Sequence, residues 1–397
     1  MDYRFSDAMS NISPSAIREI LKYSSDPAVV PFSAGNPAPE AFPVSRIAEI
    51  SARILSERPI TALQYGATEG YQPLREHLCR YLKEKHRIGS EADSLIITTG
   101  AQQVMELAAK SLCNAGDVII TEDPSFIGSL NSFRSIGAKL VGVPIRPDGM
   151  DLEALEEALK ANLNAKLVYT IPNFQNPTGV TMSWEKRQGV YALAKRYGVL
   201  IVEDNPYGDL RFAGEDIPAI KTLDTDGIVI YAGSFSKVLS PGMRVAYAVG
   251  PEPVIRKMTV AKQGEDVHTN MWAQMVTYEF MQEGFEQHLD SLRAIYRKKA
   301  ELMMRLCDEH LVPTGITYLP IEGGLFLWAT LPEGADMPRF CTEAVKEHKV
   351  AFVPGTAFLT DQSVPCRSFR LNFSTPTDEA MIRGMQILGK FAHEYLK

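Results

Sequence analysis

Short, continuous apolar runs are the feature of this sequence that most restricts its fold. The runs have no polar face, which is typical of strands that a parallel sheet buries on both sides. Segments with helical apolar spacing lie between them, for example Val104, Leu107, Ala108 and Leu112. This alternation predicts an α/β sheet covered by helices. The six expected strands are 94–98, 117–121, 139–143, 167–171, 199–202 and 228–231.

The chain of 397 residues is too long for one compact core, which predicts a large domain and a smaller one. Helix formers dominate 252–307, with an interruption near 264–270. We expect the smaller α/β domain beyond them. Its expected strands are 324–330, 350–353 and 369–373, with a helix at 339–347. The predicted division is an N-terminal helix and arm (1–45), a large domain (46–285) and a small domain (286–397).

Composition excludes several kinds of partner. A net charge of -7 gives no reason to expect nucleic acid or an anionic membrane surface. The five cysteines have no CxxC or metal-ligand spacing, and the seven histidines are scattered, so we expect reduced thiols, a cytoplasmic location and no metal. The first fifteen residues lack the features of a signal peptide, and no segment is long and apolar enough to be expected to span a membrane.

The segment 234–237 contains two serines and Lys237, and Arg244 follows shortly after it. Strand ends are where α/β sheets bind their ligands. Hydroxyls and a guanidinium suit phosphate oxygens, which would leave the lysine amine to attack an aldehyde. On this stretch alone, an exposed surface lysine is the favoured interpretation.

Three further polar segments follow expected strands. In TTGAQQ the chain turns through Gly100 into a helix, whose free N–H groups can bind an anion, although an ordinary turn gives the same pattern. Asn176 in NFQNPTG can direct its amide at a ligand, or only stabilise a proline-rich turn. In EDNPYG, Asp204 can hold a proton on a pyridine nitrogen, or cap a helix. Tyr207 can donate a hydrogen bond to a phenolic oxygen of the same ring.

Taken together, TTGAQQ, NFQNPTG, EDNPYG and SFSKVLSPGMR resemble the signature series of class I and II aminotransferases that depend on pyridoxal 5'-phosphate (PLP). The resemblance extends to SAGNPAPEAFP, LQYGATEGYQPLRE, EGGLFLW and RSFRLNFS, and it is strongest to the 2-aminoadipate, kynurenine and aromatic branch. It implies fold type I, in which a mainly parallel seven-stranded sheet is sandwiched by helices. The small domain would combine the C-terminal part with the N-terminal segment.

The resemblance also implies a role for each matching residue. Lys237 would hold PLP as a Schiff base and shuttle a proton, Asp204 would pair with the pyridinium nitrogen, and Arg370 would grip the α-carboxylate of the substrate. Each arginine also has an interpretation without a function: Arg370 can form a surface ion pair, and Arg18 can be a solvated helix residue. The remaining implied roles are phenolic-oxygen ligands (Asn176, Tyr207), phosphate ligands (Gly100, Ala101, Gln102, Ser234, Ser236, Arg244), a ring-stacking residue (Phe126), residues at the substrate mouth (Gly35, Asn36), a second-carboxylate ligand (Arg18) and a residue reaching the partner's phosphate in a homodimer (Tyr65).

The implied reaction moves the amino group of an amino acid to a 2-oxo acid, usually 2-oxoglutarate. β-Lyases, decarboxylases and racemases share the scaffold and remain open as alternatives. A PLP-sensing transcription regulator is less favoured, because the motifs begin within the first few tens of residues and the net charge is acidic. Neither GxGxxG after the first strand nor GxxxxGK[ST] is present, which argues against a dinucleotide or ATP enzyme.

Overall fold

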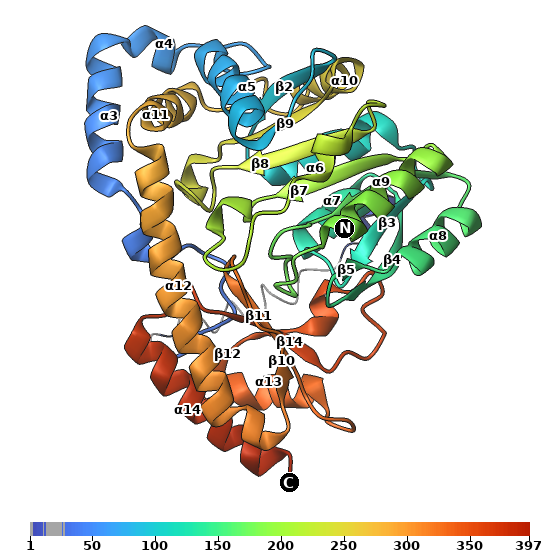
Figure 1. Cartoon of the computed structure of the whole chain (residues 1–397), viewed down its shortest axis with the longest axis vertical. Coiled ribbons are helices and arrows are strands. Elements are labelled where there is room, and N and C mark those ends of the chain that lie inside the picture. Colours follow the sequence, from blue (N-terminus) through green and yellow to red (C-terminus); the bar gives the residue numbers. More distant parts are fainter. Residues whose placement is uncertain (1–2, 11, 13–25, 27) are drawn as a thin grey trace.

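The computed structural model describes residues 3–10, 12, 26 and 28–397. Its larger sheet occupies the upper half of the view in Figure 1. Seven strands form this sheet, and a two-residue strand adds an eighth at one edge. In spatial order they are β2 (Asp93–Thr98), β9 (Ala246–Pro251), β8 (Val229–Ser234), β7 (Leu200–Asn205), β6 (Ala165–Thr170), β3 (Val118–Asp123), β4 (Lys139–Arg146) and β5 (Gly149–Met150).

Strand β9 is the antiparallel member among the seven. Its first residue, Ala246, pairs with Thr98 at the end of β2 and with Ser234 at the end of β8. The start of β9 therefore lies at the same edge of the sheet as the carboxyl ends of its neighbours. This geometry brings Arg244, just before β9, to the edge where the segments after β2 and β8 emerge.

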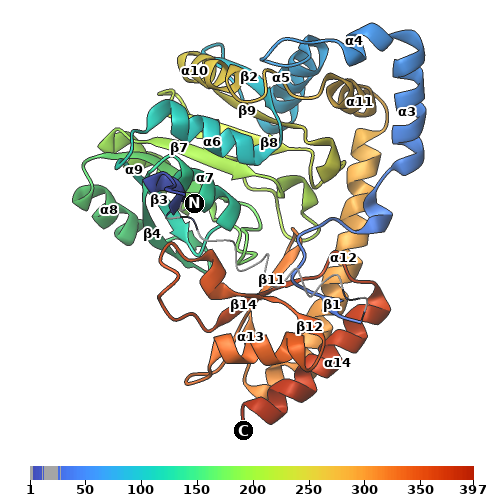
Figure 2. The ribbon, with the colours of Figure 1, turned by 180° about the vertical axis from the view of Figure 1, so that it is seen from behind.

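Helices cover both faces of the large sheet, as the alternation of apolar residues along its strands requires. Ile119 of β3 packs on the side of α6 and α7, whereas its neighbour Ile120 packs on the side of α8 and α9. Figure 1 is seen from the side of α8 and α9, and Figure 2 from the side of α6 and α7. The helices are α1 (Asp7–Ser10), α3 (Val44–Glu57), α4 (Pro59–Leu63), α5 (Gln72–His86), α6 (Ala101–Leu112), α7 (Ile127–Ser135), α8 (Leu152–Ala161), α9 (Trp184–Tyr197), α10 (Glu252–Gln263), α11 (Met271–Gln282), α12 (Phe285–His310), α13 (Met337–Lys346) and α14 (Asp378–Tyr395).

A smaller sheet lies at the other end of the molecule, and the long helix α12 runs from one part to the other (Figure 1). The smaller sheet is antiparallel, in the order β10 (Thr317–Tyr318), β11 (Phe326–Thr330), β14 (Ser368–Asn372) and β13 (Val353–Pro354). Beside it, β1 (Val30–Pro31) pairs in parallel with β12 (Val350–Ala351). The chain after β1 thus joins the C-terminal part. Short 3₁₀ helices are η1 (Pro39–Ala41), η2 (Gly208–Leu210), η3 (Ile220–Leu223), η4 (Pro241–Met243), η5 (Val312–Thr314) and η6 (Gly355–Phe358).

The predicted architecture of a large, mainly parallel sheet and a smaller unit is confirmed. One predicted strand, 350–353, is wrong in detail because β12 and β13 pair with different partners on either side of Phe352. Strand β9 was not predicted, because its small residues and Gly250 blur the apolar pattern. Within the described ranges, no helix is both long and apolar enough to cross a membrane. The domain boundaries stay predictions.

Candidate active site

A cavity of about 350 Å³ opens between the carboxyl edge of the large sheet and the small sheet. Its wall is built from loops that follow β2, β3, β6, β7 and β8, from the segment after β1 and from β14. The sequence-predicted residues that line it are Gly35, Asn36, Ala101, Gln102, Phe126, Asn176, Asp204, Tyr207, Ser234, Ser236, Lys237, Arg244 and Arg370. Residues separated by more than 300 positions in the chain thus meet in one cavity.

Lys237 extends into this cavity from the loop after β8. Its Nζ donates a hydrogen bond to the carbonyl oxygen of Gly35, at 2.8 Å. Burial lowers the pKa of Lys237 to about 8, and the positive charges of Arg370 and Arg244 act in the same direction. Roughly a tenth of the amine is therefore unprotonated at pH 7, far more than for an ordinary lysine, and this is the form that attacks a carbonyl carbon.

Asp204 lies near the end of β7 and is buried. Oδ2 accepts a hydrogen bond from the hydroxyl of Tyr169, at 2.8 Å, whereas Oδ1 has no hydrogen-bond partner among the described residues. No ion pair to Asp204 occurs in the part of the chain that the structure describes. Burial raises the pKa of Asp204 to about 7, and the hydrogen bond from Tyr169 partly offsets that rise. A cationic N–H group directed at Oδ1 would satisfy this carboxylate.

Arg370 enters the cavity from β14 and is buried, with 3% of its surface exposed. Its guanidinium donates to Asn176 Oδ1 at 2.9 Å and to two backbone carbonyls, of Ser33 at 3.0 Å and Ala34 at 3.3 Å. Nε has no partner, and no described carboxylate pairs with Arg370. Burial lowers the pKa of Arg370 to about 10, still well above neutral. The site therefore holds a buried cation whose charge only neutral groups contact.

Asn176 and Tyr207 connect this cation to the middle of the cavity. Asn176 Nδ2 donates to the hydroxyl oxygen of Tyr207, at 3.3 Å. The ring of Tyr207 packs edge-on against Phe326, and the Arg370 guanidinium lies 4.1 Å from the centroid of the same Phe326 ring. Burial raises the pKa of Tyr207 far above its usual range, so the hydroxyl stays protonated and can donate a hydrogen bond.

The turn between β2 and α6 has the form of an anion-binding cradle. Gly100 has a φ of 85°, a backbone conformation that residues with a side chain rarely adopt, and a Cβ there would meet the guanidinium of Arg244, so glycine is strongly favoured. Helix α6 begins at Ala101 without a side-chain cap, which leaves its first N–H groups free. Ala101, Gln102, Arg244, Ser234 at the end of β8 and Ser236 after it all line the cavity, and the dipole of α6 favours an anion beside them.

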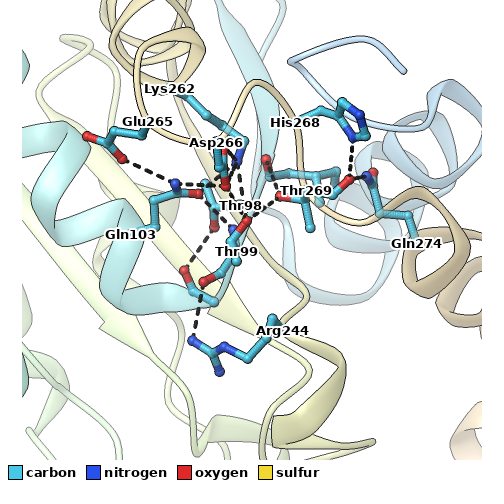
Figure 3. A network of polar contacts seen from close by, with 12 residues as sticks. Thr98, Thr99, Gln103, Arg244, Lys262, Glu265, Asp266, His268, Thr269 and Gln274 are labelled. Carbon is cyan, nitrogen blue, oxygen red and sulfur yellow. Dashed lines mark hydrogen bonds and ion pairs between the residues drawn. The ribbon is translucent and has the colours of Figure 1, made fainter. Parts of the chain in front are cut away.

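A polar network supports this cradle from behind (Figure 3). Lys262 Nζ, buried at the end of α10, contacts Asp266 Oδ1 at 2.6 Å and Gln103 Oε1 at 2.8 Å. Gln103 Oε1 also accepts from the Thr99 backbone N–H at 2.8 Å, and the Thr99 carbonyl accepts from Arg244 at 3.2 Å. The network therefore ties both sides of the cradle to α10.

Several wall residues were not predicted from the sequence, namely Ser33, Ala34, Ser129, Ile171, Pro206, Pro241 and Phe326. Tyr169, which contacts Asp204 from outside the cavity, was not predicted either. Tyr169 stands in an apolar strand, where a tyrosine is typical of a core position. Phe326 lies within EGGLFLW, so its motif was noted although the residue was not. Ser33 and Ala34 contact Arg370 through their backbone carbonyls, which any residue type would supply, so the sequence holds no signal for them.

Two predicted residues that the structure describes do not line the cavity. Gly100 lies directly behind the wall, against Arg244. Tyr65 projects from the segment after α4, is 81% exposed and packs edge-on against His268, at a centroid distance of 5.8 Å. It lies on a separate surface hollow. Arg18 lies outside the described residues, so its predicted role stays a prediction.

The residues present fit pyridoxal phosphate. The cradle beside Gly100 suits its phosphate, the unpartnered Oδ1 of Asp204 suits its protonated ring nitrogen, and Tyr207 suits its phenolic oxygen. Lys237 supplies an amine for its aldehyde. Fold and site together define the class of PLP-dependent enzymes that place the cofactor at the carboxyl edge of a parallel sheet.

Comparison with known proteins narrows this class. The family Aminotransferase class I and II matches residues 27–388. Aromatic-amino-acid aminotransferase 1 of Thermococcus litoralis is 37% identical over 404 residues, which cover 100% of this chain and 96% of that protein.

Two solved structures are closely similar. Kynurenine aminotransferase of Pyrococcus horikoshii, in complex with PMP, superimposes with a TM-score of 0.94 at 36% identity, covering 99% of this chain and 98% of that one. The α-aminoadipate aminotransferase LysN of Thermus thermophilus, complexed with N-(5'-phosphopyridoxyl)-L-leucine, superimposes with a TM-score of 0.89 at 37% identity, covering 99% and 97%. This chain belongs to the class I and II aminotransferase family and is a PLP-dependent enzyme.

Proposed function

We propose that this aminotransferase moves the amino group of an L-amino acid to 2-oxoglutarate by a ping-pong mechanism, in which one site serves both substrates. The candidate donors are 2-aminoadipate, aromatic, branched and glutamate-like amino acids. Support for this range comes from the similar enzymes named above, which are aromatic-amino-acid, kynurenine and α-aminoadipate aminotransferases.

The observation that carries the proposal is the buried guanidinium of Arg370. A buried cation needs an anion, and a carboxylate can accept two parallel hydrogen bonds from one guanidinium. Arg370 shares the cavity with Lys237, and Asn176 links it to Tyr207. An α-amino acid or a 2-oxo acid bound through its carboxylate would therefore present its α-carbon to the lysine.

When bound, PLP supplies an aldehyde that condenses with amines and a ring that withdraws electrons from the substrate's α-carbon. Lys237 would first hold the cofactor covalently. Once a substrate amine has displaced it, Lys237 would take the proton from the α-carbon and deliver it to the cofactor's aldehyde carbon. Its pKa of about 8 suits both steps, because the amine can release and accept a proton near neutral pH.

The other wall residues would hold and tune the cofactor. Asp204 would keep the ring nitrogen protonated, and Tyr207 and Asn176 would donate hydrogen bonds to the phenolic oxygen. Phe126 would stack on the ring. Phosphate binding falls to the turn 100–102, to Ser234 and Ser236, and to Arg244. Gly35 and Asn36 stay assigned to the substrate mouth, and Arg18 to a second substrate carboxylate.

A panel of amino donors assayed with 2-oxoglutarate tests this function. We expect the absorbance of the bound cofactor to be bleached by productive amino acids and restored by 2-oxoglutarate. A β-lyase would instead release ammonia without needing a 2-oxo acid, and a decarboxylase would release carbon dioxide. Either release as the dominant product, or no bleaching by any donor, would contradict the proposal.

A homodimer forms part of the proposal, with Tyr65 reaching the phosphate of the partner subunit. Leu55, 42% exposed, and Leu63, 74% exposed, line the same surface hollow as Tyr65, and Ile60 of α4 is 75% exposed. Such clusters are typical of protein interfaces. We also retain a cytoplasmic location, which the five free cysteines support.

A further inference from the structure

Tyr169 is a buried residue of β6 that lies behind the proposed site. Its hydroxyl lies 2.8 Å from Asp204 Oδ2 and 2.8 Å from Ser129 Oγ. Tyr169 pairs in register with Val202, so Asp204 lies diagonally across from it on the same face of the sheet. None of its ring is exposed, and the ring does not line the cavity, so Tyr169 cannot touch a ligand there.

The count of protons fixes the direction of these hydrogen bonds. An ionised carboxylate only accepts, and a tyrosine hydroxyl carries one proton. When Asp204 is ionised, that proton must be donated to Oδ2. Ser129 on α7 must then donate its own proton to the tyrosine oxygen. The three groups form a directed chain from Ser129 through Tyr169 to Asp204.

This chain treats the two oxygens of Asp204 differently. Oδ2 is held by Tyr169, whereas no residue that the structure describes contacts Oδ1 by a hydrogen bond, and Asp204 itself lines the cavity. A carboxylate with one oxygen fixed cannot rotate freely about its χ2 bond. Burial opposes ionisation of Asp204, and the donated hydrogen bond favours it. Glu122 on β3 and Tyr207 after β7 are the other titratable groups whose charge is coupled to Asp204.

We propose that Tyr169 is a positioning residue, which holds the ionised carboxylate of Asp204 with Oδ1 directed at the ring nitrogen of the cofactor. This inference rests on the proposed role of Asp204. Tyr169 also packs edge-on against Phe133, at a centroid distance of 5.3 Å, so a purely structural role is the competing explanation. The two explanations differ in whether the hydroxyl matters to the cofactor.

Tyr169→Phe removes the hydroxyl and keeps the ring. The readout is the ¹⁵N chemical shift of PLP labelled at its ring nitrogen and bound to the enzyme at pH 8. We expect a shift toward the value of unprotonated pyridine, because Asp204 loses both its orientation and part of its charge stabilisation. We also expect kcat to fall about tenfold, as for loss of a hydrogen bond to a charged group, while KM for the amino acid changes less than about threefold.

Tyr191→Phe is the matched control. Tyr191 also donates a hydrogen bond to an aspartate, Asp226 Oδ2 at 2.6 Å, but it lies on α9, away from the cavity. The Tyr191→Phe substitution should leave the ¹⁵N shift of the bound cofactor unchanged. Ser129→Ala, which keeps the tyrosine hydroxyl, should move the shift in the same direction as Tyr169→Phe but by less. A change of the ¹⁵N shift in Ser129→Ala that equals or exceeds the change in Tyr169→Phe would overturn the directed chain of hydrogen bonds.

Asp204→Asn separates failure of this inference from failure of the proposed function. A changed ¹⁵N shift in Asp204→Asn with wild-type values for both shift and kcat in Tyr169→Phe would overturn the role of Tyr169 alone. A wild-type shift in both variants would overturn the role of Asp204 as well. Should Tyr169→Phe fail to fold, the Ser129→Ala comparison decides the question.

Discussion

At the scale of single residues, the site is defined by buried charges for which the described part of the chain supplies no counter-charge. Lys237 and Arg370 share a cavity, and burial lowers the pKa of both, whereas burial raises the pKa of Asp204. Each group is costly for folding taken alone. Bound ligands would offset this cost, because a phosphate and a carboxylate would balance the buried cations and a cationic ring nitrogen would balance Asp204.

Asp204→Asn should stabilise the cofactor-free enzyme at pH 8. Because the pKa of Asp204 in the folded chain, about 7, lies above its ordinary 3.8, the folded state binds this proton more tightly than the unfolded state. The free energy of unfolding therefore falls as pH rises from about 4 to about 7. At about 1.4 kcal/mol for each pKa unit, the loss above pH 7 reaches roughly 4 kcal/mol.

Denaturant titration of the wild type and of Asp204→Asn, each at pH 5 and pH 8, measures this loss of stability. The variant should lose less stability than the wild type between these pH values. Burial also raises the pKa of Glu122 to about 7, and the charge of Asp204 adds to that rise, so the comparison measures Asp204 together with its effect on Glu122. An identical pH dependence of the two proteins would contradict the assignment of an unpaired buried carboxylate to Asp204.

Arg370→Gln should separate substrate binding from cofactor binding. The guanidinium is the proposed partner of the substrate carboxylate, so KM for the amino acid should rise about 100-fold, as expected for loss of a bidentate ion pair. The affinity for PLP should change little. Initial rates at varied amino-acid concentration give KM, and an absorbance titration with PLP gives the affinity for the cofactor. Release of PLP at unchanged amino-acid affinity would show that Arg370 serves the cofactor instead.

At the scale of elements, the sequence predicts what lies at a strand end better than how strands pair. Apolar runs located six strands of the large sheet, and the polar residues after β2, β6, β7 and β8 all reached one cavity. The antiparallel β9, which brings Arg244 to that cavity, left no periodic signal. Tyr169 was missed because its hydrogen bond crosses to another strand, a relation that no local pattern contains.

Lys262→Met tests whether α10 supports the phosphate cradle. The substitution removes the contacts of Lys262 with Asp266 and Gln103, and so loosens Thr99, whose carbonyl binds Arg244. We expect the affinity for PLP to fall about tenfold, in line with loss of one hydrogen bond to a charged group. The affinity for pyridoxal, which has no phosphate, should stay unchanged. Fluorescence titration measures both.

Lys221→Met is the control for that variant. Lys221 is another buried lysine, paired with Asp93 at 2.7 Å and Asp224 at 2.8 Å, but it lies beside the amino ends of β2 and β8, remote from the cradle. It should lower stability without discriminating between PLP and pyridoxal. If Lys262→Met weakens the two ligands equally, its role is general stability and not phosphate binding.

At the scale of the whole molecule, the cavity depends on two sheets and on the segment after β1, which pairs with β12. The sequence predicted both units because their strands and motifs are local. It did not predict the carbonyl contacts of Ser33 and Ala34 with Arg370, because these depend on how the two units pack. A partner subunit would complete the site only if Tyr65 crosses an interface.

Mixing two inactive variants tests that interface. In a hybrid dimer of one Lys237→Ala chain and one Tyr65→Ala chain, one site would keep its own Lys237 and receive an intact Tyr65 from its partner. Random exchange should therefore restore about a quarter of wild-type activity at limiting PLP. A mixture of Lys237→Ala with Arg370→Ala should restore none, because both residues serve the site of their own chain. Equal behaviour of the two mixtures would contradict a shared site.

The most direct test of the account is to locate the covalent bond to the cofactor. The enzyme is loaded with PLP, reduced with sodium borohydride, digested and analysed by peptide mass spectrometry. We predict a phosphopyridoxyl group on the peptide that contains Lys237, and none on that peptide in Lys237→Ala. Stoichiometric modification of a different lysine in the wild-type enzyme, with Lys237 unmodified, would contradict the account.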